Sequence, residues 1–278
     1  ILSSNEFTNH NIDLNKININ ILKRNIPLLI QRSIPLISRY GLDEPTVFHS
    51  SYYRINYSKK VFNVVTVHDF IAEKFFKKNK LSRLMKWFAI NNADHLICIS
   101  ESTKKDLLHF FPHINENKIT VIYHGSSDKF YQTKSTSHIE KFNIKDKPYI
   151  LFVGQRHSYK NFNLCLKLIS HHQKYNLLTV GGNQLDNNEM KLYNDFKNWH
   201  HLGTVSEIEL NELYNNAFCL FYPSSYEGFG MPLIDAMKVG CPVIVNSSSS
   251  LVEIGSNYAT IVDVFNKKDL YSSIYKMK

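Results

Sequence analysis

The sequence predicts an α/β protein with two doubly wound domains, each a parallel sheet covered by helices on both faces, that face each other across a cleft. Short segments made almost entirely of apolar residues alternate with helical segments, a pattern typical of strands buried on both faces. The alternation occurs twice, before and after a polar connector at residues 126–147. With 278 residues, 43% of them hydrophobic, the chain can form two cores of ordinary size.

The first alternation follows residues 1–45, for which we expect polar loops and short helices interrupted by Pro27 and Pro35. A β-branched run at 61–67 predicts a strand that ends at His68. The remaining elements expected in this half are a helix at 71–91, a strand at 96–99, a helix at 101–110 with Ser100 as its N-cap, and a strand at 119–123.

The second alternation opens with a nearly all-apolar strand at 149–153, which ends at Gly154. Further along the chain, Pro232 suits the first position of a helix and Gly240 stops that helix. Because ligands of such sheets bind at the carboxyl ends of the strands, we expect the functional residues there. The elements expected in this half are helices at 162–172, 208–215 and 232–239 and strands at 177–180, 218–222 and 242–245.

The connector places the domain boundary near residue 145, so we expect an N-terminal domain at 1–145 and a C-terminal domain at 146–278. The chain begins at Ile1 without a methionine, and residues 270–278 have the pattern of the middle of a helix. We therefore expect a fragment, with an incomplete first domain and without the last helices of the second.

The bulk composition limits the class of protein. None of the four cysteines forms a CxxC pair and all lie in apolar stretches, which predicts buried reduced thiols and favours the cytosol. No apolar run reaches the roughly 18–20 residues that a bilayer-spanning helix needs. The net charge of +9 favours nucleic acid, anionic lipid or phosphorylated small molecules as partners.

The most informative stretch is residues 224–237, which read SSYEGFGMPLIDAM. It places Glu227 in a loop after a strand and Asp235 in the first turn of the next helix, so both carboxylates can face one cleft. Carboxylates accept hydrogen bonds from adjacent sugar or ribose hydroxyls, and amides at a helix start can receive phosphate oxygens. An ordinary loop with Asp235 as a first-turn anion explains the two acids but not the whole string.

This string, followed by GCPVI at 240–244, resembles the signature of the GT4 family of retaining glycosyltransferases, which have the GT-B fold. The resemblance covers residues 48–263. The other matching segments, in order, are VHD at 67–69, ISES at 99–102, IYHG at 122–125, FVGQR at 152–156, YKN at 159–161, LGTVS at 202–206, LY at 213–214 and FYPS at 221–224.

The resemblance implies a role for each matching residue. Glu227 would contact hydroxyls of the donor sugar, Lys160 would bind the donor diphosphate, and His68 would face the donor sugar from the first domain, so these three are the expected catalytic residues. The residues that would contact the donor are Gly154, Arg156, Lys160, Val205, Glu227, Gly228, Phe229, Gly230, Met231 and Asp235.

The chain departs from the family pattern at three positions. The family usually has Glu where Asp235 stands, to bind the nucleotide ribose, and Asp is shorter by one methylene. The family often has Arg directly after the glycine, where this chain has Gln155 and then Arg156. His124 stands where the family tends to have Asn, and we treat it as a cleft residue without an assigned role.

No metal or other cofactor is expected. The chain has no Asp-x-Asp sequence, the spacing with which glycosyltransferases of the other major fold hold a divalent cation on the diphosphate. Cationic side chains and a helix N-terminus would take the place of the metal. The histidine pairs at 171–172 and 200–201 are not at metal-ligand spacing with cysteines or acids.

Residues 74–88 combine five lysines and Arg83 with Phe, Leu, Met and Trp. On a helix they would form a cationic amphipathic surface, which suits an anionic bilayer. The alternative is a helix that packs its apolar face in the first domain and leaves its lysines solvated. Nucleic acid is not an expected partner, because no nucleic-acid-binding module accompanies these charges.

The motifs and the resemblance together predict a glycosyltransferase that moves a hexosyl group from a nucleotide-diphosphate sugar to a glycan or lipid-linked acceptor in cell-surface polysaccharide synthesis, such as that of lipopolysaccharide. The resemblance implies that the anomeric configuration is retained. The first domain would bind the acceptor and the second the donor, with GDP-mannose the first choice of donor. The expected location is the cytoplasm or the cytoplasmic face of the inner membrane. The alternatives are a catalytically silent sugar-nucleotide-binding protein of the same fold and a nucleotide-sugar epimerase.

Overall fold

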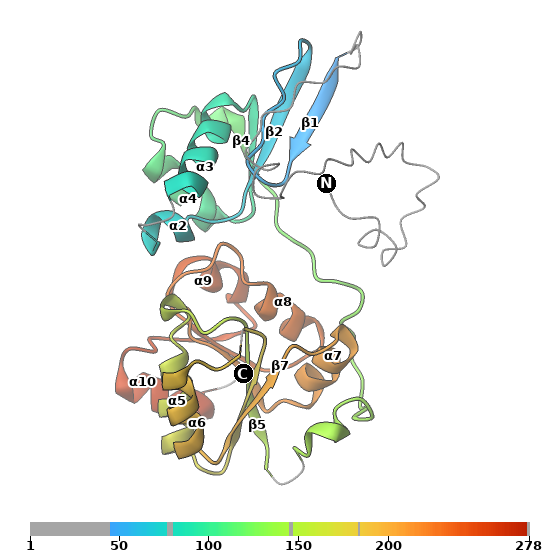
Figure 1. Ribbon diagram of the computed structural model, residues 1–278, viewed down its shortest axis with the longest axis vertical. Helices are drawn as coiled ribbons and strands as arrows, with labels where there is room; N and C mark the ends of the chain where they lie inside the picture. Colours follow the sequence, from blue (N-terminus) through green and yellow to red (C-terminus); the bar gives the residue numbers. More distant parts are fainter. Residues whose placement is uncertain (1–44, 77–79, 145–146, 183, 277–278) are drawn as a thin grey trace.

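The computed structural model describes residues 45–76, 80–144, 147–182 and 184–276. The elements expected at 1–44, and Lys77 and Lys78 of the basic segment, lie outside the described residues. Within them the chain forms two α/β bodies, one above the other in Figure 1, each built on a parallel sheet. The predicted α/β class with two parallel sheets is therefore confirmed. No helix among the described residues is both long enough and apolar enough to cross a membrane.

The first sheet has the strand order β1-β2-β3-β4, and all of its strands are parallel. Its strands are β1 (Thr46–Ser50), β2 (Val61–Val67), β3 (His95–Cys98) and β4 (Ile119–Val121), and its helices are α2 (Ile71–Lys74), α3 (Lys80–Asn92) and α4 (Glu101–Phe110). Ser100 is the N-cap of α4, as predicted, because its hydroxyl accepts a hydrogen bond from the amide of Thr103 at 2.9 Å.

The prediction of a single helix at 71–91 is wrong, because the structure has two helices there, α2 and α3. The first of its two helices, α2, ends at Lys74, where Phe75 leaves the helical region with a φ of −121°. Just past this helix end, the ring of Phe75 lies 5.3 Å from that of Tyr159 in the second body. Strand β1 was not predicted, because its alternation of half-buried and exposed residues gives no continuous apolar run.

The second sheet has the order β10-β9-β8-β5-β6-β7 and is also parallel. Its strands are β5 (Tyr149–Val153), β6 (Asn176–Val180), β7 (Trp199–Gly203), β8 (Cys219–Tyr222), β9 (Val243–Asn246) and β10 (Thr260–Val262). Its helices are α5 (Phe162–His171), α6 (Asn187–Asp195), α7 (Glu207–Asn216), α8 (Met231–Lys238), α9 (Ser249–Gly255) and α10 (Lys267–Ser272).

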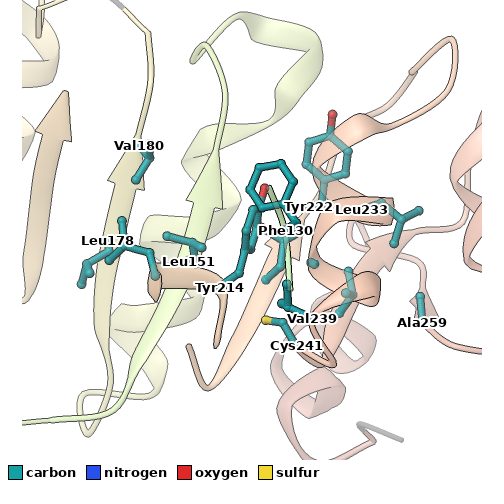
Figure 2. Packing of buried hydrophobic residues seen from close by; sticks show 14 of the residues in the cluster. Phe130, Leu151, Leu178, Val180, Tyr214, Tyr222, Leu233, Val239, Cys241 and Ala259 are labelled. Carbon is teal, nitrogen blue, oxygen red and sulfur yellow. The ribbon is translucent and has the colours of Figure 1, made fainter. Parts of the chain in front are cut away.

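Side chains from alternate positions of this sheet form two cores, one on each face. Ile150 and Phe152 of β5 enter the core that α5 covers, whereas Leu151 enters the core that α7 and α8 cover. Figure 2 shows the second of these, where Leu151 and Leu178 lie side by side near Tyr214. Each fully buried side chain of this size contributes about 1.5–3 kcal/mol to folding. Burial on both faces explains why these strands read as continuous apolar runs.

The two bodies contact each other through α4 and α9. The Glu253 carboxylate of α9 accepts hydrogen bonds from the amides of Glu101 and Ser102, at 2.7 and 2.9 Å. These amides lie in the first turn of α4, where no intrahelical partner exists and a negative charge is favourable. In Figure 1, α9 accordingly lies at the edge of the lower body that faces the upper one. A side chain of one domain thus caps a helix of the other.

Candidate functional site

The site is built on the loop between β8 and α8, at the carboxyl end of a central strand. Gly230 ends this loop with a φ of +104°, a left-handed conformation that suits only glycine well, and it is the N-cap of α8. Pro232 occupies the first turn of α8, as its missing amide hydrogen allows. The loop therefore carries Glu227 out of the sheet toward the first domain.

Lys160 and Glu227 form an ion pair across two neighbouring strands. The Lys160 ammonium lies 2.5 Å from a Glu227 carboxylate oxygen and donates a second hydrogen bond to the Tyr222 hydroxyl at 3.1 Å. Lys160 follows β5 and Glu227 follows β8, and these strands are paired in the sheet. The side chains are 12% and 10% exposed, so the pair is largely buried yet reachable from solvent. The two expected catalytic residues of the second domain are thus in direct contact.

The backbone of Glu227 is held by serines at the start of α9. Its amide donates to the Ser249 hydroxyl at 2.9 Å, and its carbonyl accepts from the Ser250 hydroxyl at 2.9 Å. Ser250 is fully buried and also donates to the Phe229 carbonyl at 3.0 Å. These bonds fix the loop from within its own domain.

Gly154 lies directly beside Lys160. It has a φ of +133°, and a Cβ atom added there would lie 3.9 Å from the Lys160 ammonium. The absence of a side chain leaves the space next to the cation open to a ligand.

Arg156 binds Glu189 of α6. Its guanidinium donates to both Glu189 carboxylate oxygens, at 2.7 and 3.2 Å, and to the Gly181 carbonyl at 3.2 Å. Burial raises the pKa of Glu189, but the hydrogen bond from Arg156, the hydrogen bond from the Asp186 amide and the charge of Arg156 together lower the pKa below its usual value. In this structure Arg156 therefore joins the end of β6 to α6.

Asp235 lies on α8 and is nearly buried. The Ser126 hydroxyl, at the start of the connector, donates to its carboxylate at 2.9 Å. Burial raises the pKa of Asp235, and the bond from Ser126 opposes that rise. Asp235 thus has a hydroxyl partner of the kind that a ribose would offer, supplied here by the chain itself.

The remaining predicted donor-site residues differ in their surroundings. Val205, after β7, is partly buried and packs against the core. Phe229 is buried, and its ring lies 5.3 Å from that of His124, edge to face. Met231 is exposed at the start of α8. Phe229 thus contacts a residue that follows the last strand of the first domain.

His68 follows β2, and its ring stacks on that of His124 at 5.9 Å. One of its ring nitrogens lies 2.9 Å from the Ser51 carbonyl, which fixes the plane of the imidazole. Partial burial, and then the neighbouring His68, lowers the pKa of His124 below its usual value. The backbone of His68 meets the loop of the second domain, because a Cβ atom added at Gly228 would lie 1.9 Å from the His68 carbonyl oxygen. His68 is thus placed against the loop that carries Glu227.

Several residues of this site could not be predicted from the sequence. Tyr222, Ser249 and Ser250 hold Lys160 and Glu227, and Tyr226 joins the loop to the first domain. The run of four serines at 247–250 was the one visible signal for the serines. Within the described part of the chain, no group of three or more His, Cys, Asp or Glu residues could hold a metal ion.

The arrangement pairs a cation with a carboxylate at the strand ends of one domain, opposite a histidine of the other. An ammonium in such a place can offset negative charge on phosphate oxygens, and a carboxylate can accept hydrogen bonds from hydroxyls. Because the two groups neutralise each other here, an incoming ligand would have to exchange their mutual bond for bonds of its own.

Two parallel-sheet domains of this kind, with their strand ends turned toward each other, define the GT-B fold of glycosyltransferases. The family model described as Glycosyl transferases group 1 matches residues 134–277, and the model described as Glycosyltransferase Family 4 matches residues 5–128. The chain belongs to the group 1 family of glycosyltransferases, as its motifs predicted.

Known proteins agree with this assignment. The O-antigen chain mannosyltransferase RfbU of Salmonella typhimurium is 30% identical over 220 residues, 76% of this chain and 59% of that protein. O-antigen chain mannosyltransferase B of Escherichia coli is 24% identical over 218 residues, 72% of this chain and 57% of that protein. Sucrose-phosphate synthase from Thermosynechococcus elongatus has the same fold, with a TM-score of 0.68 at 20% identity over 86% of this chain and 65% of that one. The chain thus spans less than two thirds of these curated relatives.

Proposed function

We propose that the protein transfers a hexosyl group from a nucleotide-diphosphate sugar to a glycan or lipid-linked acceptor, with retention of anomeric configuration. The single observation that carries this proposal is the contact of Lys160 with Glu227 at the strand ends that face the first domain. The second domain binds the donor and the first binds the acceptor. The family membership supports the transferase class.

Lys160 acts on the leaving group. Its ammonium bonds to diphosphate oxygens and stabilises the charge that develops when the glycosidic bond breaks. Glu227, released from Lys160, accepts hydrogen bonds from hydroxyls of the donor sugar, and Asp235 accepts them from the ribose. No residue is assigned as a covalent nucleophile, so assistance at the leaving diphosphate is the main source of rate in this proposal.

The proposed donor is GDP-mannose and the proposed product a cell-surface polysaccharide. This choice is supported by two relatives named O-antigen chain mannosyltransferases. The alternatives of the same fold, a silent binding protein and an epimerase, make different use of the donor. A silent protein binds it without releasing nucleotide, and an epimerase converts its sugar while the diphosphate stays attached.

The test is nucleotide release by the full-length protein incubated separately with GDP-mannose, UDP-glucose and UDP-GlcNAc. We expect release from one donor, lost in Lys160→Ala and Glu227→Ala and kept in Lys167→Ala, which removes an exposed lysine of α5. The anomeric configuration of the product, read by NMR, tests retention. Well-folded protein that neither binds nor consumes any donor contradicts the proposal.

We also propose that α3 contacts an anionic membrane surface. Its apolar side chains Leu81, Leu84 and Trp87 are exposed, Trp87 at 52%. Leu84 and Trp87 border a groove of ≈ 510 Å³ that Lys80 and Arg83 also line. The prediction that Lys86 belongs to this cationic surface is wrong, because its side chain is 3% exposed and its ammonium binds Glu73 at 2.8 Å. Apolar anchors beside cationic groups suit a bilayer with acidic headgroups, at the cytoplasmic face of the inner membrane.

Co-sedimentation with vesicles tests this second proposal. We expect binding to phosphatidylglycerol vesicles, weaker binding to phosphatidylcholine, and loss of both in Leu84→Glu. The control Ile208→Glu places the same charge at an exposed apolar position of α7. If Leu84→Glu and Ile208→Glu bind vesicles equally well, α3 is not the contact surface.

A further inference from the structure

Tyr226 belongs to the second domain in sequence but packs in the core of the first. It is 3% exposed and lies in the hydrophobic cluster that contains Phe70 and Leu107. Its ring also lies 6.1 Å from that of Phe75, and the Lys74 ammonium lies 4.2 Å from the ring centroid. A side chain one position before Glu227 is thus buried in the other domain.

The Tyr226 hydroxyl has two partners, and both are in the first domain. It accepts a hydrogen bond from the Phe70 amide at 3.1 Å and donates one to an Asp106 carboxylate oxygen at 2.7 Å. The other oxygen of Asp106 binds Lys74 at 2.7 Å, which fixes the carboxylate in place. The hydroxyl is therefore satisfied only while the two domains are together.

The residue after Glu227 is held from the first domain as well. The Gly228 carbonyl accepts hydrogen bonds from the Ser100 hydroxyl at 2.7 Å and from the Thr103 hydroxyl at 3.0 Å. Ser100 and Thr103 are fully buried. Both neighbours of Glu227 in the chain thus bind the first domain, whereas Ser249 and Ser250 hold Glu227 itself from the second.

We infer that Tyr226 is a positioning residue, which sets the place of Glu227 through its bonds to Asp106 and Phe70 and so makes donor binding depend on the first domain. The inference rests on the proposed role of Glu227 toward the donor. Glu227 lies between two residues anchored on the opposite domain, so a displacement of Tyr226 moves the carboxylate relative to Lys160. Tyr226 itself touches no part of the donor in this account.

The test compares Tyr226→Phe with Tyr149→Phe in the full-length protein. Tyr149 is a matched control, because its buried hydroxyl donates to the Leu213 carbonyl at 2.7 Å within the second domain alone. We expect Tyr226→Phe to weaken binding of the donor by about tenfold in titration calorimetry, since two hydrogen bonds across the domains are lost. Tyr149→Phe should lose comparable stability yet bind donor like the wild type.

Two substitutions of Asp106 test the same hydrogen bond from the other side. Asp106→Asn keeps an oxygen acceptor for the Tyr226 hydroxyl and should bind donor nearly as the wild type does, whereas Asp106→Leu should behave like Tyr226→Phe. The inference is overturned if folded Tyr226→Phe binds donor as tightly as Tyr149→Phe does.

Hydrogen exchange without donor separates this inference from the proposed function. In Tyr226→Phe we expect faster exchange of amides in the loop at 226–230 and at the start of α4, and no such change in Tyr149→Phe. If the wild type binds no donor, the proposed function fails, but the exchange comparison still decides whether Tyr226 couples the loop to the first domain. Unchanged exchange in Tyr226→Phe contradicts that coupling.

Discussion

At the scale of single residues, the Lys160–Glu227 pair bears on stability as well as on its proposed role at the donor site. Its members are 12% and 10% exposed, and they are joined at 2.5 Å. Desolvation of two charges offsets most of their attraction, so the pair contributes little net stability. Removal of one partner is different, because it leaves the other charge largely buried without compensation. The ligand-free site therefore depends on both residues being present.

We predict that Lys160→Met and Glu227→Gln each lower the free energy of unfolding by about 3 kcal/mol, whereas the double variant loses much less than the sum. The double variant removes both charges together, so no unpaired charge remains. Urea unfolding of the wild type and the three variants gives the coupling free energy. Additive losses would mean that the two side chains do not form the pair.

His124 is predicted to make stability depend on pH. Partial burial and His68 lower its pKa in the folded protein below the usual 6.5, so below pH 6.5 the unfolded chain binds more protons than the folded one. Stability should therefore fall as the pH falls through that region. In His124→Asn the loss of stability with falling pH should be smaller, and thermal unfolding measured at a series of pH values would show this. The control is His109→Asn, on α4, whose stability should depend on pH as that of the wild type does. Equal slopes in both variants would exclude His124 as a source of the effect.

At the scale of elements, the strands of the second sheet that were predictable are those buried on both faces. Leu151 stands in an unbroken apolar run because both of its neighbours along the strand, Ile150 and Phe152, enter the opposite core. Strand β7 was missed because His200 and His201 interrupt its apolar pattern. Helix α6 was missed because it has no buried residue, although the capping box of Asp186 and Glu189 was a usable signal.

The residues of the site were predictable only where they belong to sequence segments that resemble the glycosyltransferase family. Lys160 and Glu227 were expected from those segments, and the structure brings them into contact. Tyr226 was not expected, because its partners Phe70 and Asp106 lie 156 and 120 positions away in the chain. Contacts at such separations depend on how two domains pack, which no local pattern encodes.

The connector is another element whose attachment was hidden in the sequence. Its residues Ser135 and His138 are bound by Glu212 of α7, which is buried. The carboxylate accepts from the Ser135 hydroxyl at 2.6 Å and from the His138 amide at 2.9 Å, and it contacts a ring nitrogen of His138 at 2.7 Å. These bonds fix the path of the chain between the two domains onto the second.

We predict that Glu212→Ala frees the connector and destabilises the protein by about 2–3 kcal/mol, since several hydrogen bonds to a buried charge are lost. Limited proteolysis should cut near residues 135–138 faster than in the wild type. Glu207→Ala is the control, because Glu207 is an exposed carboxylate of the same helix that binds Lys129 near the start of the connector. Cleavage that is no faster in Glu212→Ala than in Glu207→Ala would rule out the proposed attachment.

At the scale of the whole molecule, the two domains are joined by a closely packed contact as well as by the connector. The loop that carries Glu227 approaches β2 so closely that Gly228 has no room for a side chain. The Tyr226 hydroxyl and the Glu253 carboxylate complete their hydrogen bonding only across the same boundary. The geometry of the candidate site thus depends on the arrangement of the two domains.

Gly228→Ala should separate the domains while leaving each one folded. The added Cβ atom would lie 1.9 Å from the His68 carbonyl oxygen, and because that oxygen is backbone, the loop or the whole domain must move. We expect a larger radius of gyration in small-angle scattering, with helix content unchanged by circular dichroism. Gly125→Ala is the matched control, since a Cβ atom there meets nothing within 4 Å. If Gly228→Ala stays as compact as Gly125→Ala, the loop has yielded locally, and closure of the domains does not depend on the glycine.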